Sequence, residues 1–241
     1  MKNILSISVC IATYNGSLYI ERQLRSILNQ IGVGDEVIIV DDFSTDDTIT
    51  IINNMEDTRV KLHKNLKNIG AVQTFSRALL LAQSDLVFLS DQDDIWYPNK
   101  VMTILEVFQT QSVDLVVHDA TVVDSSGKII SQSLFNMRKS GNGILKNITS
   151  NTYTGCCMSF RRELLNKVLP IPEKLGLYHD AWTGIVAECS GLKCIFLRTS
   201  LIEWNRHGGN LSVTNRRSII TILSERFFLI TALLHRLIRN L

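Results

Sequence analysis

The feature that most constrains the fold is a repeated change of hydrophobic pattern along the first 120 residues. Short apolar runs rich in β-branched residues alternate with segments in which apolar residues recur every three to four positions. The apolar runs, which predict strands, cover residues 6–12, 36–40, 60–63, 85–90 and 114–118. Helices are predicted between them, over residues 18–30, 47–55, 71–82 and 98–109. This alternation predicts an α/β fold with a mostly parallel central sheet and helices on both faces.

Polar clusters follow three of these predicted strands, at the points where the strands end. The clusters are Thr13-Tyr14-Asn15, Asp41-Asp42 and Asp91-Gln92-Asp93-Asp94. Ligands of parallel α/β sheets bind at the carboxyl ends of the strands. We therefore expect the three clusters to converge on one site.

The second half of the chain has a less regular pattern. A polar, glycine-containing stretch over residues 134–151 is interpreted as a mobile loop that orders over a bound ligand. The remaining predicted elements are a hairpin over residues 121–128, strands over 154–160, 193–198 and 202–204, and helices over 161–168 and 180–190.

Composition limits the functional class and the compartment. Of 241 residues, 45% are hydrophobic, which is enough for the core of one large domain, and the net charge of +2 argues against a nucleic-acid binder. The five cysteines are odd in number and form no C-x-x-C pair, which argues against a disulfide framework or a zinc site. The start of the chain lacks a signal-peptide pattern, and no apolar run reaches the ~20 residues of a membrane span. These features predict a cytoplasmic protein.

The C-terminal stretch has a long helical pattern with high apolar content, interrupted by arginines that include Arg216, Arg217 and Arg226. Two interpretations stay open. A basic helix with a wide apolar face can lie in a membrane interface, peripheral to the inner face of the cytoplasmic membrane. The same pattern suits a helix packed on its own domain. We expect a domain over residues 1–215, with halves 1–120 and 121–215, followed by a basic amphipathic helix over 216–241.

The aspartate cluster at residues 91–94 carries the strongest chemical signal. Three carboxylates this close repel one another, so a cation is their natural compensation. Mg²⁺ and Mn²⁺ favour oxygen ligands and are often held by one or two carboxylates together with substrate phosphates. The alternative is a helix N-terminus carrying acidic residues that the helix dipole favours.

Two histidine-containing segments occur late in the chain. His179-Asp180 opens a predicted helix, where Asp180 suits either a general base or a helix N-cap. His207 lies in a glycine-rich loop, Arg206-His207-Gly208-Gly209-Asn210, and suits a metal ligand, a phosphate contact or an exposed surface histidine.

The motifs resemble those of the family 2 inverting glycosyltransferases, which have the GT-A fold. The resemblance is carried by residues 8–16 (SVCIATYNG), 40–48 (VDDFSTDDT) and 89–98 (LSDQDDIWYP), which occur in the family's order and spacing. Further along, Gly155-Cys156, His179-Asp180-x-Trp182 and Arg206-His207-Gly208 resemble the bacterial rhamnosyltransferase-like branch, which builds O-antigen and capsule polysaccharides.

The resemblance implies roles for particular residues. The nucleotide sugar would be held by Thr13, Tyr14, Asn15, Asp41 or Asp42, Asp91 and Gln92, and the metal, Mg²⁺ or Mn²⁺, by Asp93 and His207. Asp180 would be the catalytic base, although the wider family often has Glu-Asp where this chain has His179-Asp180. Contacts to the acceptor or the donor sugar would come from Asp94, Trp96, Gly155, Cys156, His179 and Trp182.

The resemblance implies an inverting transfer of a sugar from dTDP-rhamnose or a UDP-hexose to a saccharide acceptor, expected to be lipid-linked. Two other functions compete with this one. A nucleotidyltransferase would need a basic glycine-rich loop after the first strand, and Thr13-Tyr14-Asn15-Gly16 contains no basic residue. A non-catalytic sugar-nucleotide binder or assembly factor would not need both Asp93 and Asp180.

Overall fold

The computed structural model describes residues 5–175, 179–208 and 219–239. Within them a nine-stranded sheet has the order β3-β2-β1-β4-β8-β6-β9-β5, with β7 pairing with β6. The strands are β1 Ile7–Thr13, β2 Glu36–Asp41, β3 Val60–Lys64, β4 Leu86–Ser90, β5 Ile95–Trp96, β6 Leu115–Asp124, β7 Ile129–Ser131, β8 Met158–Arg161 and β9 Cys194–Arg206.

The first half of the sheet is parallel. In β1, Cys10 is in register with Ile38 of β2 and Leu89 of β4, and β3 pairs with the outer side of β2. Every residue of β2 and β4 is buried, which explains why these strands are continuous apolar runs. Because all four strands run the same way, their carboxyl ends lie at one edge of the sheet.

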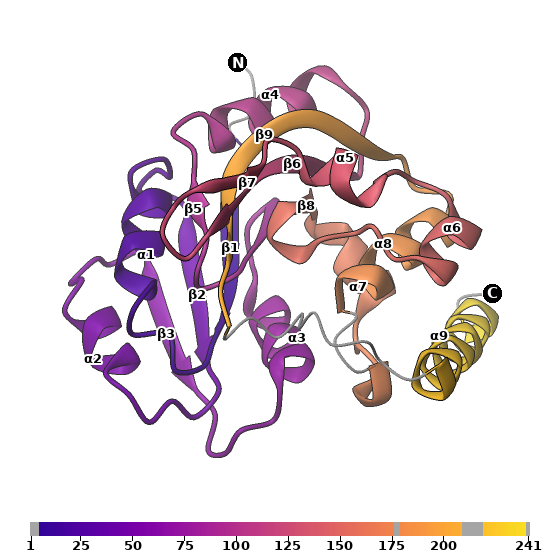
Figure 1. The fold of residues 1–241 in the computed structure, drawn as a ribbon, viewed down its shortest axis with the longest axis horizontal. Helices are drawn as coiled ribbons and strands as arrows, with labels where there is room; N and C mark the ends of the chain where they lie inside the picture. The colour runs from indigo at the N-terminus through magenta and orange to yellow at the C-terminus, as the bar shows by residue number, and fades with distance from the viewer. Residues whose placement is uncertain (1–4, 176–178, 209–218, 240–241) are drawn as a thin grey trace.

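Helices cover this parallel half on both sides. In Figure 1, α1 and α2 lie on one side of β1–β3, and α3 lies on the other side, against β1 and β2. The helices here are α1 Ile20–Leu28, α2 Thr48–Asn53, α3 Ala71–Leu81 and α4 Lys100–Thr110. The predicted α/β architecture with a mostly parallel sheet is confirmed.

The second half of the sheet contains antiparallel pairs. β8 lies between β4 and β6 and runs antiparallel to both, while β9 runs parallel to β6 and antiparallel to β5. The prediction of two separate strands over residues 193–198 and 202–204 is wrong, because β9 is one continuous strand, Cys194–Arg206. Exposed Arg198 and Thr199 interrupt the apolar pattern, and the register with β6 shifts beside Asp119.

The stretch over residues 134–151 is not a structureless loop. It contains α5 Leu134–Arg138 and α6 Ile144–Thr149. The buried Asp119 carboxylate accepts a hydrogen bond from Phe135 N at 2.9 Å, and buried Asn147 Oδ1 accepts one from Thr152 N at 2.9 Å. Side-chain hydrogen bonds to the backbone therefore hold this segment, and the expectation of a mobile loop is wrong.

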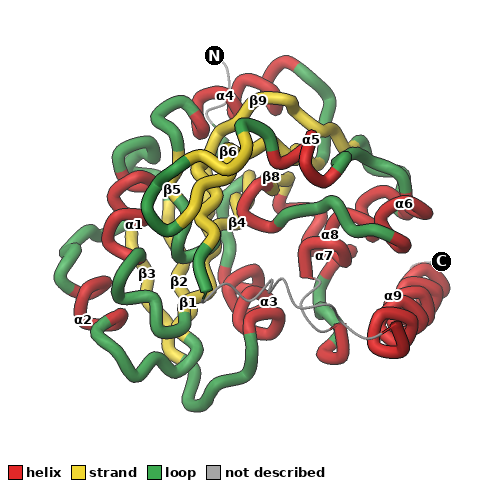
Figure 2. The backbone as a smooth tube through the Cα atoms, in the orientation of Figure 1, coloured by secondary structure: helices red, strands yellow, loops and turns green. Residues whose placement is uncertain are grey.

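The predicted strand over residues 154–160 is replaced in its first part by a 3-10 turn. This turn is η1 Gly155–Cys157, and the strand β8 begins only at Met158. The elements that follow are η2 Arg162–Leu164, α7 Leu165–Val168, η3 Glu173–Leu175 and α8 His179–Cys189. Figure 2 shows α6, α7 and α8 gathered on one side of the molecule, away from β3.

The last described element is α9 Ile219–Arg239, which packs on the domain. Leu229 and Leu233 are buried, and Arg236 Nη1 donates a hydrogen bond to the carbonyl oxygen of Leu169 at 2.6 Å. The opposite face leaves Phe227 and Leu234 exposed. Among the described helices, none combines the length and apolar character needed to cross a membrane. Arg216, Arg217 and the expected boundary at residue 215 lie outside the described residues.

Candidate functional site

The ends of β1 and β4 are joined by paired hydrogen bonds. The Tyr14 N–H donates to Gln92 Oε1 at 3.0 Å, and Gln92 Nε2 donates to the Tyr14 carbonyl at 3.2 Å. A Cβ atom on Gly16 would lie 2.3 Å from Gln92 Oε1, so only glycine allows this approach. The Tyr14 side chain stays 47% exposed beside the strand ends.

The end of β2 is built around two buried carboxylates. Asp41 accepts hydrogen bonds from Thr13 Oγ1 at 3.0 Å and from Ser44 N at 2.9 Å. Asp42 accepts hydrogen bonds from the backbone N–H groups of Ile69 and Gly70, both at 2.8 Å. These contacts fix the loops that follow β2 and β3.

Asn15 ties the loop after β1 to the loop after β2. Its Oδ1 accepts a hydrogen bond from Thr45 N at 2.8 Å, and its own N–H donates to Ser44 Oγ at 2.9 Å. In the described contacts, the side chain of Asn15 therefore holds the strand-end loops in place, as the side chains of Asp41 and Asp42 do.

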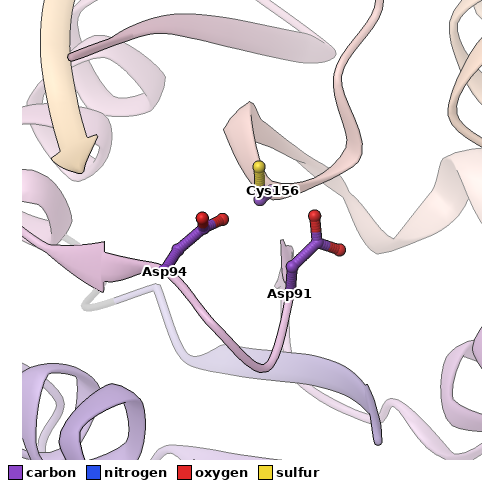
Figure 3. Close-up of side chains that lie close together, drawn as sticks. All are labelled: Asp91, Asp94 and Cys156. Atoms are coloured by element: carbon purple, nitrogen blue, oxygen red, sulfur yellow. The ribbon is translucent and has the colours of Figure 1, made fainter. Parts of the chain in front are cut away.

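Asp91 and Asp94 converge with Cys156 beyond the end of β4 (Figure 3). One ligand atom from each residue lies within 4.8 Å of the other two, and Cys156 comes from η1, far away in sequence. Asp94 is 1% exposed: its Oδ1 accepts a hydrogen bond from Asn205 N at 3.1 Å, whereas its buried Oδ2 has no hydrogen-bond partner in the described part of the chain.

Burial makes ionisation of these acids unfavourable. Burial, reinforced by the nearby charge of Asp93, raises the pKa of Asp91 to about 7 and the pKa of Asp94 well above its ordinary value. Both carboxyls are therefore protonated more readily than ordinary aspartates, and a bound cation would favour their ionised forms.

Lys100 is a fully buried cation beside this cluster that sequence reasoning missed. Its Nζ donates to the Cys156 carbonyl at 3.0 Å and lies 3.9 Å from the centroid of the Trp96 ring. Burial lowers the pKa of Lys100 to about 8. Spacing could have revealed it, because Lys100 shares the buried face of α4 with Ile104 and Phe108 at four-residue intervals.

The structure brings together Asp93 and His207, which are 114 positions apart in sequence. Asp93 Oδ2 and His207 Nε2 lie 2.7 Å apart, with side chains only 12% and 11% exposed. The His207 ring also stacks on Tyr19, with centroids 4.6 Å apart. Gly209 and Asn210, which continue the predicted glycine-rich loop, lie outside the described residues.

The first turn of α8 places His179 and Asp180 beside η1. Asp180 Oδ1 accepts hydrogen bonds from Ala181 N at 2.6 Å and from Asn151 Nδ2 at 3.3 Å, and burial raises the pKa of this carboxyl. A Cβ on Gly155 would lie 3.0 Å from His179 Nε2 and 3.8 Å from the Asp180 Cβ. Glycine therefore lets η1 approach this helix start closely.

His179 is a buried imidazole packed against an aromatic ring. Its ring stacks on Phe75 with centroids 4.3 Å apart, and neither ring nitrogen has a partner among the described residues. Burial lowers the pKa of His179, so the ring is neutral at physiological pH.

The donor set fits a divalent cation. Mg²⁺ and Mn²⁺ favour carboxylate oxygens, which Asp91 and Asp94 supply within one group and Asp93 supplies nearby. Among the described residues, no donor reaches Asp94 Oδ2. The thiol of Cys156 suits such an ion less well, because interaction with Cys157 and burial raise its pKa well above the ordinary value and keep it protonated.

Two predicted site residues, Trp96 and Trp182, are buried and expose almost no surface at the acid cluster. Trp182 is fully buried; its Nε1 donates to the Val168 carbonyl at 2.8 Å, and Arg236 of α9 lies against its ring. Trp96 is 2% exposed and lies against Lys100. In the described contacts, both indoles pack the core around the site.

Comparison with known proteins gives a family match over two-thirds of the chain. The model of glycosyl transferase family 2 matches residues 8–169. An uncharacterised glycosyltransferase of Nostoc sp. is 31% identical over 232 residues, which is 92% of this chain and 70% of the relative.

Two characterised relatives match shorter stretches. The dTDP-rhamnosyl transferase RfbG of Shigella flexneri is 36% identical over 39% of this chain and 35% of its own length. The UDP-Glc:alpha-D-GlcNAc-diphosphoundecaprenol beta-1,3-glucosyltransferase WfaP of Escherichia coli is 36% identical over 44% of this chain and 43% of its own length. The chain thus spans less than half of these two relatives.

Solved structures share the fold. TarS of S. aureus in complex with UDP-GlcNAc superposes with a TM-score of 0.76 at 22% identity, covering 93% of this chain and 65% of TarS. The mannosyltransferase PcManGT from Pyrobaculum calidifontis, in complex with GDP-Man and Mn²⁺, gives a TM-score of 0.64 at 19% identity, covering 97% of this chain and 64% of that one. These likenesses identify the GT-A fold.

Proposed function

The chain belongs to glycosyl transferase family 2, and from this premise we propose that it transfers a sugar, with inversion, from a nucleoside-diphosphate sugar to a saccharide acceptor. One observation carries the proposal. The acid cluster after β4, the Asp93–His207 pair and Asp180 in the first turn of α8 are gathered beyond the strand ends. Electrostatic coupling between Asp91 and Asp180 supports their proximity.

The donor nucleotide is proposed to bind at the ends of β1, β2 and β4. Tyr14 offers an exposed ring for stacking on the base, while Thr13 and Gln92 fix the strand ends around it. Asp42 is the proposed base contact, since its Oδ2 accepts a hydrogen bond from Gly70 N and keeps accepting capacity. Asp91 is proposed to contact the ribose or the metal's surroundings.

Asp93 and His207 are the proposed ligands of Mg²⁺ or Mn²⁺, with Asp91 and Asp94 beside them. When bound, such an ion would neutralise negative charge that develops on the departing diphosphate. The chain itself supplies the fixed geometry: Asn205 N holds Asp94 Oδ1 at 3.1 Å, and Lys100 holds η1 through the Cys156 carbonyl at 3.0 Å.

Asp180 is the proposed general base. Its carboxylate would take the proton from the acceptor hydroxyl as that oxygen attacks the anomeric carbon from the face opposite the leaving group. Ala181 N and Asn151 Nδ2 both donate to Oδ1, and a backbone hydrogen bond from Gly155 also acts on the carboxylate, so these contacts orient it. Neutral His179 and Gly155 border the same position and are proposed to contact the acceptor or the donor sugar.

The finer specificity rests on the relatives. RfbG, named a dTDP-rhamnosyl transferase, and WfaP, named for UDP-Glc and a diphosphoundecaprenol-linked acceptor, support dTDP-rhamnose or a UDP-hexose as donor and a lipid-linked saccharide as acceptor. We place the reaction in O-antigen or capsule assembly, at the inner face of the cytoplasmic membrane. The exposed apolar residues of α9, Phe227, Ile230 and Leu234, support peripheral contact with that membrane.

A thermal-shift panel with UDP, dTDP and GDP, each with and without Mn²⁺, tests the proposal. A nucleotide at a hundred times its Kd should stabilise the fold by about 2.7 kcal/mol, or roughly 5–10 °C in Tm for a chain of this size. We expect one of the three nucleotides to give such a shift, and expect Mn²⁺ to enlarge it.

The matched variant for this panel is Asp93→Ala. It should keep the Tm of the free protein near that of the native chain while losing the additional shift due to Mn²⁺. Equal shifts in the native chain with and without Mn²⁺, or an Asp93→Ala variant with unchanged Mn²⁺ dependence, would contradict the metal assignment.

A further inference from the structure

Two arginines from distant parts of the chain lie against one tryptophan. Arg138, the last residue of α5, has its guanidinium carbon 4.8 Å from the centroid of the Trp204 ring. Arg206, the last residue of β9, has its guanidinium carbon 4.7 Å from the same ring. Trp204 is 6% exposed, so the core fixes the surface that both cations share.

The two positive charges are close enough to disfavour each other. Both guanidinium groups lie on the ring of one buried tryptophan, which keeps them near each other. Arg138 itself makes no ion pair with a carboxylate among the described residues and donates one hydrogen bond, from Nη1 to Thr154 Oγ1 at 3.2 Å. Like charges held together at a partly buried position are stabilised by a bound anion.

The arginine pair lies beside the proposed base. Thr154, which Arg138 contacts, directly precedes Gly155, and a Cβ on Gly155 would lie 3.8 Å from the Asp180 Cβ. Arg138 also lies close enough to Asp180 for its positive charge to favour the ionised carboxylate. Arg206, at the end of β9, directly precedes His207, which pairs with Asp93. The arginine pair therefore borders both the proposed base and the proposed metal ligands, and Arg138 is the member on the side of Asp180.

We propose that Arg138 and Arg206 form an anion subsite that binds a phosphate or diphosphate group of the acceptor. Guanidinium groups present paired N–H donors that match phosphate oxygens. The proposal rests on the proposed function, because it assigns the acceptor to the Asp180 side of the site. The other source of the same chemistry is the diphosphate of the donor, and the experiment separates the two.

The probe is geranyl diphosphate, a water-soluble prenyl diphosphate, titrated into the full chain by calorimetry with Mg²⁺ in excess. We expect Arg138→Met to weaken its binding about tenfold, which corresponds to about 1.4 kcal/mol, and expect Arg138→Lys to retain part of the affinity. Geraniol, which lacks the diphosphate, should bind far more weakly. Native affinity in Arg138→Met, or equal binding of geraniol, would overturn the proposal.

Arg161→Met is the matched control. Arg161 also lies against an aromatic ring, with its guanidinium carbon 5.4 Å from the Phe108 centroid, but it pairs with Leu86 at the opposite end of β4. We expect this variant to bind geranyl diphosphate like the native chain. A loss equal to that of Arg138→Met would show a general effect of removing a stacked arginine and would also overturn the proposal.

A second titration, with the donor nucleotide and Mn²⁺ at saturation, identifies the source of the phosphate. Retained affinity for geranyl diphosphate is expected if the arginines serve the acceptor. Displacement by the nucleotide would assign them to the donor diphosphate and reject the acceptor subsite. Failure of the glycosyltransferase assignment gives a different result, because no nucleotide would then shift the Tm while the titration, which needs no transfer activity, could still succeed.

Discussion

At the scale of the residue, Asp180 carries a prediction on pH dependence. Burial raises the pKa of this carboxyl, and a general base acts in its ionised form. The rate should therefore fall as pH decreases through a pKa above the ordinary ~3.9 of an aspartate. Asp180→Asn should lower kcat by about 10²- to 10⁴-fold and abolish this acidic limb. Initial rates between pH 4 and 9 measure both effects.

The same carboxyl gives an independent readout from stability. A raised pKa means that the ionised form destabilises the folded chain above that pKa, so Asp180→Asn should not lower the Tm at pH 8. Asparagine retains Oδ1, which accepts the hydrogen bonds from Ala181 N and Asn151 Nδ2. An inactive variant with a much lower Tm would indicate a structural role instead of a base.

Phe43 carries a second prediction, because it adopts a backbone conformation that suits other residues better. Its φ is +71°, its side chain is 52% exposed, and it lies between Asp42 and Ser44 at the end of β2. A left-handed conformation costs a non-glycine residue about 1–2 kcal/mol, and asparagine tolerates it better. Such strain often persists at functional sites.

Phe43→Asn should therefore raise the Tm and reduce the shift that the donor nucleotide produces. The matched control is Glu56→Asn, since Glu56 has a φ of +48° in a turn away from the strand ends. It should also raise the Tm while leaving the nucleotide shift unchanged. Equal nucleotide shifts in the two variants would remove Phe43 from the donor site.

The sequence indicated which residues gather at the strand ends better than it indicated the hydrogen bonds that their side chains make. The motif with Asp41 and Asp42 could not reveal that Asp41 accepts from Thr13 and Ser44 within the fold, because these contacts depend on the loop geometry. Lys100 was overlooked because a lysine is seldom buried without compensation. Its compensation comes from the Cys156 carbonyl, 56 positions away.

At the scale of the element, Gly184 determines how α8 packs. A Cβ at this position would lie 2.4 Å from three ring carbons of Tyr153, and Tyr153 is completely buried. Gly184→Ala should lower the free energy of unfolding by about 3 kcal/mol through overpacking. It should also lower activity, since the first turn of α8 carries His179 and Asp180.

Gly34→Ala is the control for this substitution. Nothing lies within 4 Å of a Cβ added at Gly34, so urea unfolding should show almost no change. If Gly184→Ala unfolded at the same midpoint as Gly34→Ala, the close packing of α8 on Tyr153 would be incorrect.

Long apolar elements were predictable, and short elements held by polar contacts were not. Strands β1, β2 and β4 are buried on both faces, so their sequences carry an uninterrupted signal. The helices α5 and α6 have only five and six residues, too few for a clear periodicity. The Asp119 carboxylate and the Asn147 amide hold this segment by accepting hydrogen bonds from backbone N–H groups. A hydrophobic pattern gives no sign of such contacts.

At the scale of the whole molecule, the order of elements along the chain predicts the parallel half of the sheet. It does not predict which later strands extend the sheet beyond β4. Strand β8 enters between β4 and β6, and Phe160 is in register with Val87 on one side and Leu115 on the other. Such pairings join residues more than 40 positions apart, and a local pattern does not specify them. The approach of η1 to Asp91 and Asp94 follows from this insertion, because η1 directly precedes β8.

The C-terminal helix α9 allows a test in which its two faces behave differently. Its inner face buries Leu229 and Leu233, whereas its outer face exposes Phe227 and Leu234, by 71% and 56%. Leu229→Ala with Leu233→Ala should destabilise the fold, since each buried leucine contributes about 2–5 kcal/mol. Phe227→Ser with Leu234→Ser should leave the Tm nearly unchanged, because these side chains are already in solvent.

Vesicle binding then separates the two interpretations of this helix. If the outer face lies in a membrane interface, the Phe227→Ser and Leu234→Ser variant should lose sedimentation with vesicles of phosphatidylglycerol and phosphatidylethanolamine, and the native chain should sediment with them. If neither protein sediments, the helix serves only the fold. In that case the outer-face variant should retain full activity on a lipid-linked acceptor, because Leu229, Leu233 and Arg236 on the inner face would still hold α9 against the domain.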